Sequence, residues 1–224
     1  MIKSTLVESS KNSEKEFVPI IPAKEALERL IQGNQDFVSG IRTTETLENR
    51  AKHIETAMDQ EPFAIILGCP DSRVPAELVF NQGLSDLFVI RVAGNIVAPS
   101  QVGSVEFAAE RFHTRLVVVL GHTHCGAIDA TLSELQQPTE NQSRNLHSIV
   151  DRIRPSVEML LKTDLRHDLP RLVQHAVRAN VVASVNQLRH GSEVLEQLIQ
   201  SEGLLVVGAE YSLETGVVEF FEGV

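Results

Sequence analysis

The chain has 224 residues, 42% of them hydrophobic, which is enough to bury the core of one large domain. Its 20 Lys and Arg against 30 Asp and Glu give a formal net charge of −10, which argues against nucleic acids and anionic membranes as partners, because both need clustered positive charge. No apolar run reaches about 18 residues, which excludes a membrane-spanning helix, and the polar start lacks the apolar segment of a secretory signal, so we expect a cytoplasmic protein.

The N-terminal part predicts an arm followed by a helix. Residues 1–22 are polar and we expect them to form a flexible arm, with residues 23–224 forming a single α/β domain. Apolar residues recur at helical spacing from Ala23 to Val38, and Gly40 is a stop signal for that helix. A weaker helical pattern covers about residues 44–58.

Beyond this point, short apolar runs alternate with helical patterns. The runs are continuous rather than alternating, which is typical of strands buried on both faces; they cover residues 63–69, 86–91, 116–121 and 204–208. Helical patterns lie between them, at residues 75–80, 102–113, 125–136 and about 144–202. Residues 216–221 follow a turn-like Glu-Thr-Gly and predict an antiparallel edge strand. The chain therefore predicts an α/β fold with a central, mostly parallel sheet of four strands plus an antiparallel C-terminal edge strand, flanked by helices.

The only two cysteines stand in two motifs of metal-ligand character, CPDSR at residues 69–73 and HTHC at residues 122–125. Two cysteines are too few for a disulfide framework, and although a single disulfide remains an alternative, their neighbours favour a metal. Cys69 ends the first predicted strand and His122 ends the third. Ligands bind beyond the carboxyl ends of the strands in such sheets, so we expect both motifs to meet at one edge.

Charge counting indicates what such a centre would do. Zinc with the thiolates of Cys69 and Cys125 and a neutral His122 carries no net charge, so a water in the fourth position would be acidified and a hydroxide nucleophile could form. Cys125 is expected near a helix N-terminus, which favours the thiolate. The alternative is a structural zinc site with four fixed ligands.

Asp71 and Arg73 favour the catalytic alternative. Residues two apart in extended backbone face the same way, so Cys69, Asp71 and Arg73 are expected to line one side. Arg73 would hold the Asp71 carboxylate by two parallel hydrogen bonds, in competition with zinc. Asp71 as fourth ligand would close the site, and its release would open it.

Three segments of the chain together resemble the β-class carbonic anhydrases: CPDSRVPAELVFNQGLSDLFVIRVAGNIV, GHTHCGAI and VVGAEYSLETG. The resemblance implies one zinc ion per subunit, held by Cys69, His122 and Cys125. It implies a lyase, carbonate dehydratase, that hydrates carbon dioxide reversibly to bicarbonate and a proton through attack by a zinc-bound hydroxide. Asp71 and Arg73 would be the dyad that gates this site.

The resemblance also implies a substrate pocket and an assembly. Gln60, Phe88 and Gly126 are expected to contact or wall the substrate, with Gln60 supplied by the partner subunit. The family is built on an intimate dimer, so we expect a homodimer or a homotetramer made of two dimers. The size of the assembly and the resting state of Asp71 do not follow from the sequence.

Two other functions fit the same residues. A hydrolase of carbonyl sulfide or carbon disulfide would share the ligand set, because access to the pocket decides between them. A non-catalytic zinc scaffold is the second alternative, and the intact Asp71 and Arg73 argue against it. His124 is either a proton shuttle or, as the simpler interpretation, an exposed residue beside the site.

Overall fold

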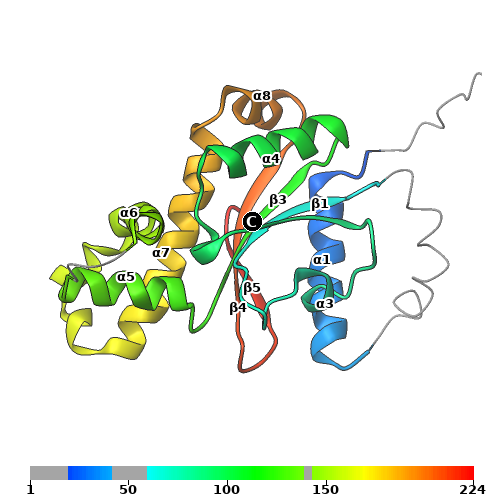
Figure 1. Cartoon of the computed structure of the whole chain (residues 1–224). Helices are drawn as coiled ribbons and strands as arrows, with labels where there is room; N and C mark the ends of the chain where they lie inside the picture. Colours follow the sequence, from blue (N-terminus) through cyan, green and yellow to red (C-terminus); the bar gives the residue numbers. More distant parts are fainter. Residues whose placement is uncertain (1–19, 42–59, 139–142) are drawn as a thin grey trace, which may run out of the picture.

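A computed structural model describes residues 20–41, 60–138 and 143–224. At its centre lies a five-stranded sheet in the order β2-β1-β3-β4-β5 (Figure 1). Its strands are β1 (Ala64–Gly68), β2 (Leu87–Arg91), β3 (Leu116–His122), β4 (Leu205–Tyr211) and β5 (Val218–Glu222). The first four strands are parallel to their neighbours and β5 pairs with β4 in the antiparallel sense, so the predicted α/β fold is confirmed.

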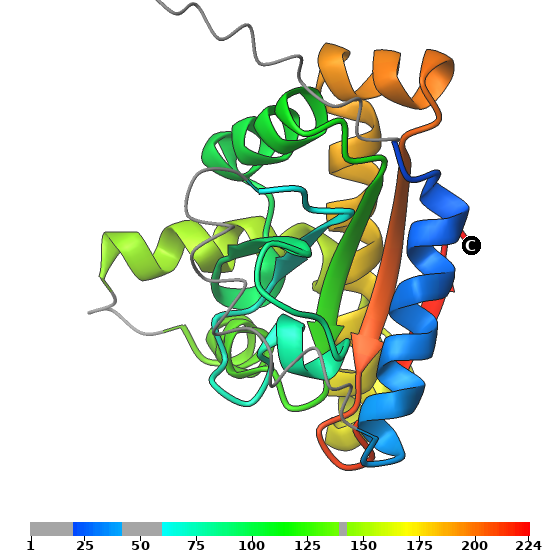
Figure 2. The same cartoon turned by 90° about the vertical axis from the view of Figure 1, so that its right-hand side faces the viewer.

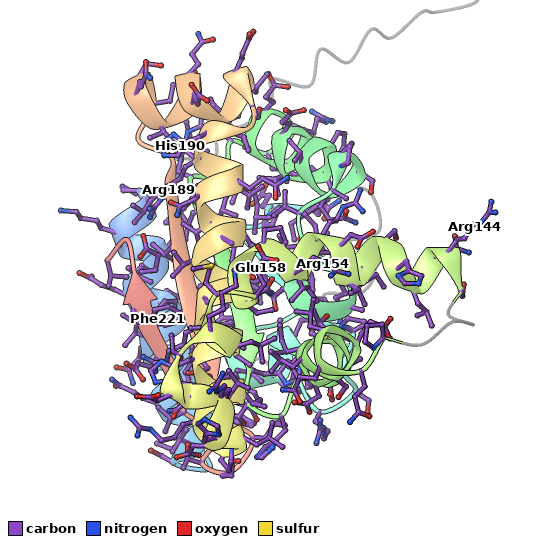
Figure 3. All side chains as sticks on the ribbon, turned by 90° about the vertical axis from the view of Figure 1, so that its left-hand side faces the viewer. Arg144, Arg154, Glu158, Arg189, His190 and Phe221 are labelled. Carbon is purple, nitrogen blue, oxygen red and sulfur yellow. The ribbon has the colours of Figure 1, made fainter. Side chains whose placement is uncertain are left out.

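Helices cover both faces of this sheet. They are α1 (Ala23–Val38), α3 (Ala76–Val79), α4 (Pro99–Arg111), α5 (Gly126–Gln136), α6 (Arg144–Val157), α7 (Leu169–His190) and α8 (Glu193–Ser201), with 3-10 turns η1 (Ala93–Asn95), η2 (Leu160–Lys162) and η3 (Asp164–His167). Figure 2 shows α1 along one side of the sheet, whereas Figure 3 looks onto the face that α7 crosses, with Arg189 and His190 near its end and Phe221 of β5 beside it. No helix in the described part of the chain is long and apolar enough to cross a membrane.

Alternation along the strands builds two apolar layers. Ile66 and Val118 face α1 and α3, while Ile65, Val117 and Val119 face α4, α7 and α8. Every residue of β1 and β3 is buried, as expected for central strands, whereas β2 at the sheet edge is partly exposed. Burial on both faces explains why the sequence shows continuous apolar runs in β1 and β3 rather than an alternating pattern.

Some predicted bounds differ from those observed. The helix predicted over residues 23–38 has the same bounds as α1. β4 continues past the predicted end at residue 208, because residues 209–211 pair with β3 on one side and β5 on the other; within this stretch the Glu210 carboxylate pairs with Arg178 of α7 at 2.7 Å. The helical region predicted over residues 144–202 divides into α6, α7 and α8, and side chains of Asp168 and Ser192 cap the last two. The helix predicted at 44–58, and all but the last three residues of the predicted arm, lie outside the described residues.

Replacing each of two helical glycines by alanine is expected to change stability in opposite directions. A Cβ on Gly33 of α1 would lie 1.9 Å from the backbone oxygen of Phe80. Gly33→Ala is therefore expected to lower the free energy of unfolding by about 1–3 kcal/mol. Gly103 of α4 is the matched control, because a Cβ there meets no atom within 4 Å, and Gly103→Ala should stabilise by about 0.5–1 kcal/mol through helix propensity. Urea unfolding of both variants tests the pair, and the same sign for both would contradict this packing of α1.

Candidate metal centre

Three side chains meet where β1 and β3 end. Cys69 follows β1 directly, His122 is the last residue of the neighbouring β3, and Cys125 is the N-cap of α5. Their ligand atoms all lie within 4.8 Å of one another, and the residues are 7%, 0% and 1% exposed, respectively. The two motifs meet because parallel neighbours bring their carboxyl ends to one edge of the sheet.

His122 presents a free lone pair to this cluster. Its Nδ1 lies 2.8 Å from the carbonyl oxygen of Thr123, and since a carbonyl only accepts, Nδ1 carries the hydrogen. The other nitrogen, Nε2, is buried and has no hydrogen-bond partner within the described ranges. An unpaired buried polar atom is costly. A soft divalent metal such as zinc, bound by Nε2 and two sulfurs, fits this donor set.

The two thiols have opposite proton preferences. The pKa of Cys69 is lowered mainly by a hydrogen bond from the Cys125 thiol, with the His122 ring and the backbone N–H groups of Gly94 and Asp71 adding to the effect against burial. The pKa of Cys125 is raised by the Cys69 thiolate and by burial, although backbone N–H groups at the start of α5 oppose this. The low pKa of Cys69 favours its thiolate, the form that binds a divalent metal, and a bound cation would favour the thiolate of Cys125 as well.

Asp71 and Arg73 form a two-bond ion pair at the rim of the cluster. Arg73 Nε donates to Asp71 Oδ1 at 2.9 Å and its terminal nitrogen donates to Oδ2 at 2.7 Å. These hydrogen bonds hold the pKa of Asp71 well below its ordinary value, so the carboxylate stays ionised. Asp71 Oδ2 is 4.0 Å from His122 Nε2, which places the carboxylate beside the ligands rather than among them.

The expected extended backbone over this motif is wrong. A hydrogen bond of 3.0 Å from Val74 N–H to the Asp71 carbonyl closes a turn. The Arg73 N–H also donates to Asp71 Oδ1, at 3.0 Å. The side chains of Asp71 and Arg73 meet because the chain folds back on itself in a turn. They are not neighbours on one side of an extended segment, as the spacing of two residues suggested.

Two predicted substrate residues lie away from the cluster of Cys69, His122 and Cys125. Gln60 precedes β1, at the opposite end of that strand from Cys69, and lines a hollow of about 220 Å³ with Arg111 and His113. Phe88 in β2 pairs with Ile65, which is roughly 13 Å along the strand from Cys69. By contrast, Gly126 is the first residue of α5, directly after Cys125.

Phe88 belongs to an aromatic cluster on the α4 side of the sheet. Its ring centroid lies 6.2 Å from that of Phe107 and 6.0 Å from that of Phe112. Phe107 is 53% exposed, so this cluster reaches the surface. The sheet thus carries an exposed aromatic surface beside β2, one of its two edge strands.

Glu214, which no sequence pattern singles out, joins the loop of residues 122–125 to the turn between β4 and β5. Its carboxylate accepts hydrogen bonds from Thr123 Oγ1 at 2.9 Å and Ser212 Oγ at 3.0 Å, and it lies 2.5 Å from His124 Nε2. The Leu213 N–H donates to Thr123 Oγ1 at 3.0 Å, so a backbone hydrogen bond also joins Thr123 to this turn. His124 is thus held at the surface by Glu214, with a side chain that is 67% exposed.

These hydrogen bonds predict a lowered pKa for the Glu214 carboxyl group. Its own backbone N–H, followed by Thr123, His124 and Ser212, lowers its pKa from 4.5 to about 2. Because the folded-state pKa is depressed, the stabilisation is present above the unfolded value and is lost as the pH falls from about 4.5 to about 2. Carboxyl-carbon NMR titration should find a midpoint near 2, and Thr123→Val should raise it. An ordinary midpoint in the unchanged protein would contradict the network.

Comparison with known proteins gives consistent matches. A family model described as carbonic anhydrase matches residues 64–218. A carbonic anhydrase of Mycolicibacterium smegmatis is 37% identical over 196 residues, covering 87% of this chain and 91% of that protein. The β-carbonic anhydrase CafA of Aspergillus fumigatus superposes with a TM-score of 0.70 at 23% identity, covering 88% of this chain and 91% of that one. One of two tetrameric β-carbonic anhydrases of Sordaria macrospora gives 0.67 at 21% identity, covering 87% and 96%. At these identities, the two solved structures bear on the fold alone.

Proposed function

This chain belongs to the β-class carbonic anhydrase family, and we propose that it hydrates carbon dioxide reversibly with one zinc ion held by Cys69, His122 and Cys125. The products are bicarbonate and a proton, which makes the protein a carbonate dehydratase. The observation that carries this proposal is the unpaired, buried Nε2 of His122 beside two thiols. In the described part of the chain, no other group of three or more His, Cys, Asp or Glu side chains brings its ligand atoms this close together.

The protein contributes two thiolates and a neutral imidazole, whose charge balances that of a zinc ion, and an oriented carboxylate. When bound, zinc supplies a Lewis acid that lowers the pKa of water and so provides a nucleophile near neutral pH. Asp71 is ionised and can accept a hydrogen bond from the attacking water, which orients it toward the substrate carbon. The backbone N–H of Gly126, at the start of α5, lies at the positive end of a helix, where a developing oxyanion is stabilised.

Arg73 has the role of a gate in this proposal. Both carboxylate oxygens of Asp71 are occupied by Arg73, so Asp71 is held away from the fourth position. If that pair opened, Asp71 would be free to take the position and close the site. The bidentate geometry supports the open arrangement as the resting one, because charge-assisted double hydrogen bonds are strong and directional.

We also propose that the active form is a homodimer, or a homotetramer of two dimers. Gln60 and Phe88 lie far from the ligands of their own subunit, so they would act in the site of the partner subunit. The Sordaria macrospora relative is described as tetrameric. The boundary between arm and domain at residue 22 and the cytoplasmic location stay predictions.

Stopped-flow hydration of carbon dioxide by the zinc-loaded protein tests the function. We expect activity at pH 7 that rises toward pH 9, because the nucleophile is the deprotonated form of water. Carbonyl sulfide and carbon disulfide should be run in parallel. Turnover of the sulfur substrates alone would replace this function by the related hydrolase, and no turnover of any of them would leave a zinc scaffold.

A further inference from the structure

A tight turn lies beside the segment that carries Cys69. It is η1, between β2 and α4, and Val92, the residue before it, donates its N–H to the carbonyl of Gly68, the residue before Cys69, at 3.0 Å. The turn is pressed against its neighbours, since a Cβ on Gly94 would lie 2.8 Å from Ile153 Cδ1 and 3.2 Å from Ala127 Cβ. Its backbone therefore comes close to the metal centre while α5 and α6 cover its other side.

This turn has an unfavourable conformation of its own. Gly94 has φ 69° and Asn95 has φ 43°, so two consecutive residues adopt the left-handed region. The Asn95 side-chain amide nitrogen is buried without a hydrogen-bond partner among the residues that the structure describes. Such conformations persist only where the surrounding structure holds them.

Two polar side chains of α7 hold the turn. Asn180 Nδ2 donates to the Gly94 carbonyl at 2.7 Å, and Ser184 Oγ donates to the Asn95 carbonyl at 3.1 Å. Both residues are buried, at 2% and 4% exposure, and they stand one helical turn apart on a face that is otherwise apolar. Burial of a polar side chain is costly unless it is hydrogen-bonded, and the turn supplies those bonds.

We propose that Asn180, supported by Ser184, is a positioning residue for the metal centre. By holding the Gly94 carbonyl, Asn180 fixes the turn between the segment that carries Cys69 and the start of α5, which follows Cys125. The inference rests on the proposed function, because it takes Cys69 to be a zinc ligand. Outer partners that orient a metal ligand typically change metal affinity or activity by about 10- to 100-fold when they are removed.

Asn34 offers a matched control for a merely structural effect. It is a buried asparagine, 4% exposed, whose side chain donates to the carbonyls of Val79 and Gly216 and accepts from the Val218 N–H. It makes more hydrogen bonds than Asn180 does, so Asn34→Ala should cost at least as much stability. None of its partners is a ligand of the proposed centre or part of η1.

Zinc transfer from the loaded protein to a chromophoric chelator measures the effect. We expect Asn180→Ala to lose zinc about 10- to 100-fold faster than the unchanged protein, Ser184→Ala to show a smaller increase, and Asn34→Ala to match the unchanged protein. In Co²⁺-substituted protein, the thiolate-to-cobalt absorption band should shift in Asn180→Ala and not in Asn34→Ala. Asn180→Ser serves if the alanine variant does not fold, and the same faster loss is expected.

Two failures are distinguishable here. Equal rates of zinc loss in Asn180→Ala, Asn34→Ala and the unchanged protein would overturn the positioning role and leave the proposed function intact. Equal acceleration in both asparagine variants would also overturn it, because the effect would then follow stability alone. An unchanged protein that retains no zinc, or binds it without a thiolate band, would instead overturn the proposed function itself.

Discussion

Replacing Cys69 by serine is expected to remove zinc from the protein and to lower carbon dioxide hydration by more than about 100-fold, since even outer partners of a metal are worth roughly 10- to 100-fold. Serine keeps the size of the side chain, but its hydroxyl stays protonated where the thiol of Cys69 has a lowered pKa. The remaining ligands would be Cys125 and His122 alone. Metal analysis of the purified variant and stopped-flow hydration measure the two effects.

Ile96→Val is the control for a change in the same core. Ile96 is 5% exposed and packs in the apolar cluster that contains Cys69 and Cys125. Removing one methylene there should cost about 0.5–1.5 kcal/mol of stability and leave zinc and activity in place. A Cys69→Ser variant that keeps a full zinc content would show that the three residues are not the ligand set.

The second large effect is expected for Asp71→Asn. The amide keeps the shape of the carboxylate but loses its charge, so it cannot be held by Arg73 through two charge-assisted hydrogen bonds. We expect hydration to fall by roughly 10²- to 10⁴-fold, the range for a group that handles a proton in the transition state. Zinc content should stay unchanged, because Asp71 lies outside the ligand cluster.

Two further variants sharpen this result. Asp151→Asn is the control, because Asp151 pairs with Arg154 at 3.5 Å on the surface of α6 and should be silent in activity. Arg73→Lys keeps the charge but loses the two-bond geometry, and we expect an intermediate loss. Unchanged hydration in Asp71→Asn would remove Asp71 and Arg73 from the mechanism.

The sequence was sufficient for the sheet and for the meeting of Cys69, His122 and Cys125 at one edge of it. Continuous apolar runs predict β1 and β3 because both strands are buried on both faces, and burial leaves no polar alternation. Cys69 and His122 each end such a run, and the rule for parallel sheets then brings them to one edge. The prediction holds because local pattern and topology agree at these positions.

One local turn and several contacts between distant segments did not follow from the sequence. The turn that brings Asp71 and Arg73 together is closed by the Val74 N–H, which donates to the Asp71 carbonyl. A spacing of two residues in the sequence fits both this turn and an extended strand. Asn180 and Ser184 could have been noticed as two polar residues four apart on the apolar face of α7, but their partners lie in η1, far away in the chain. Gln60 and Cys69 lie at opposite ends of β1, and their separation could be known only once the bounds of that strand were known.

The order β2-β1-β3 has a consequence for how the protein is made. β1 and β3 are neighbours in the sheet, yet β2 and α4 lie between them in the chain, so their pairing is a long-range event that forms slowly. During synthesis Cys69 emerges before its fellow ligands exist, and α7, which holds the turn at Gly94, emerges later still. Zinc capture in refolding should therefore follow β1–β3 pairing rather than the initial collapse, which makes the metal a kinetic probe of the sheet.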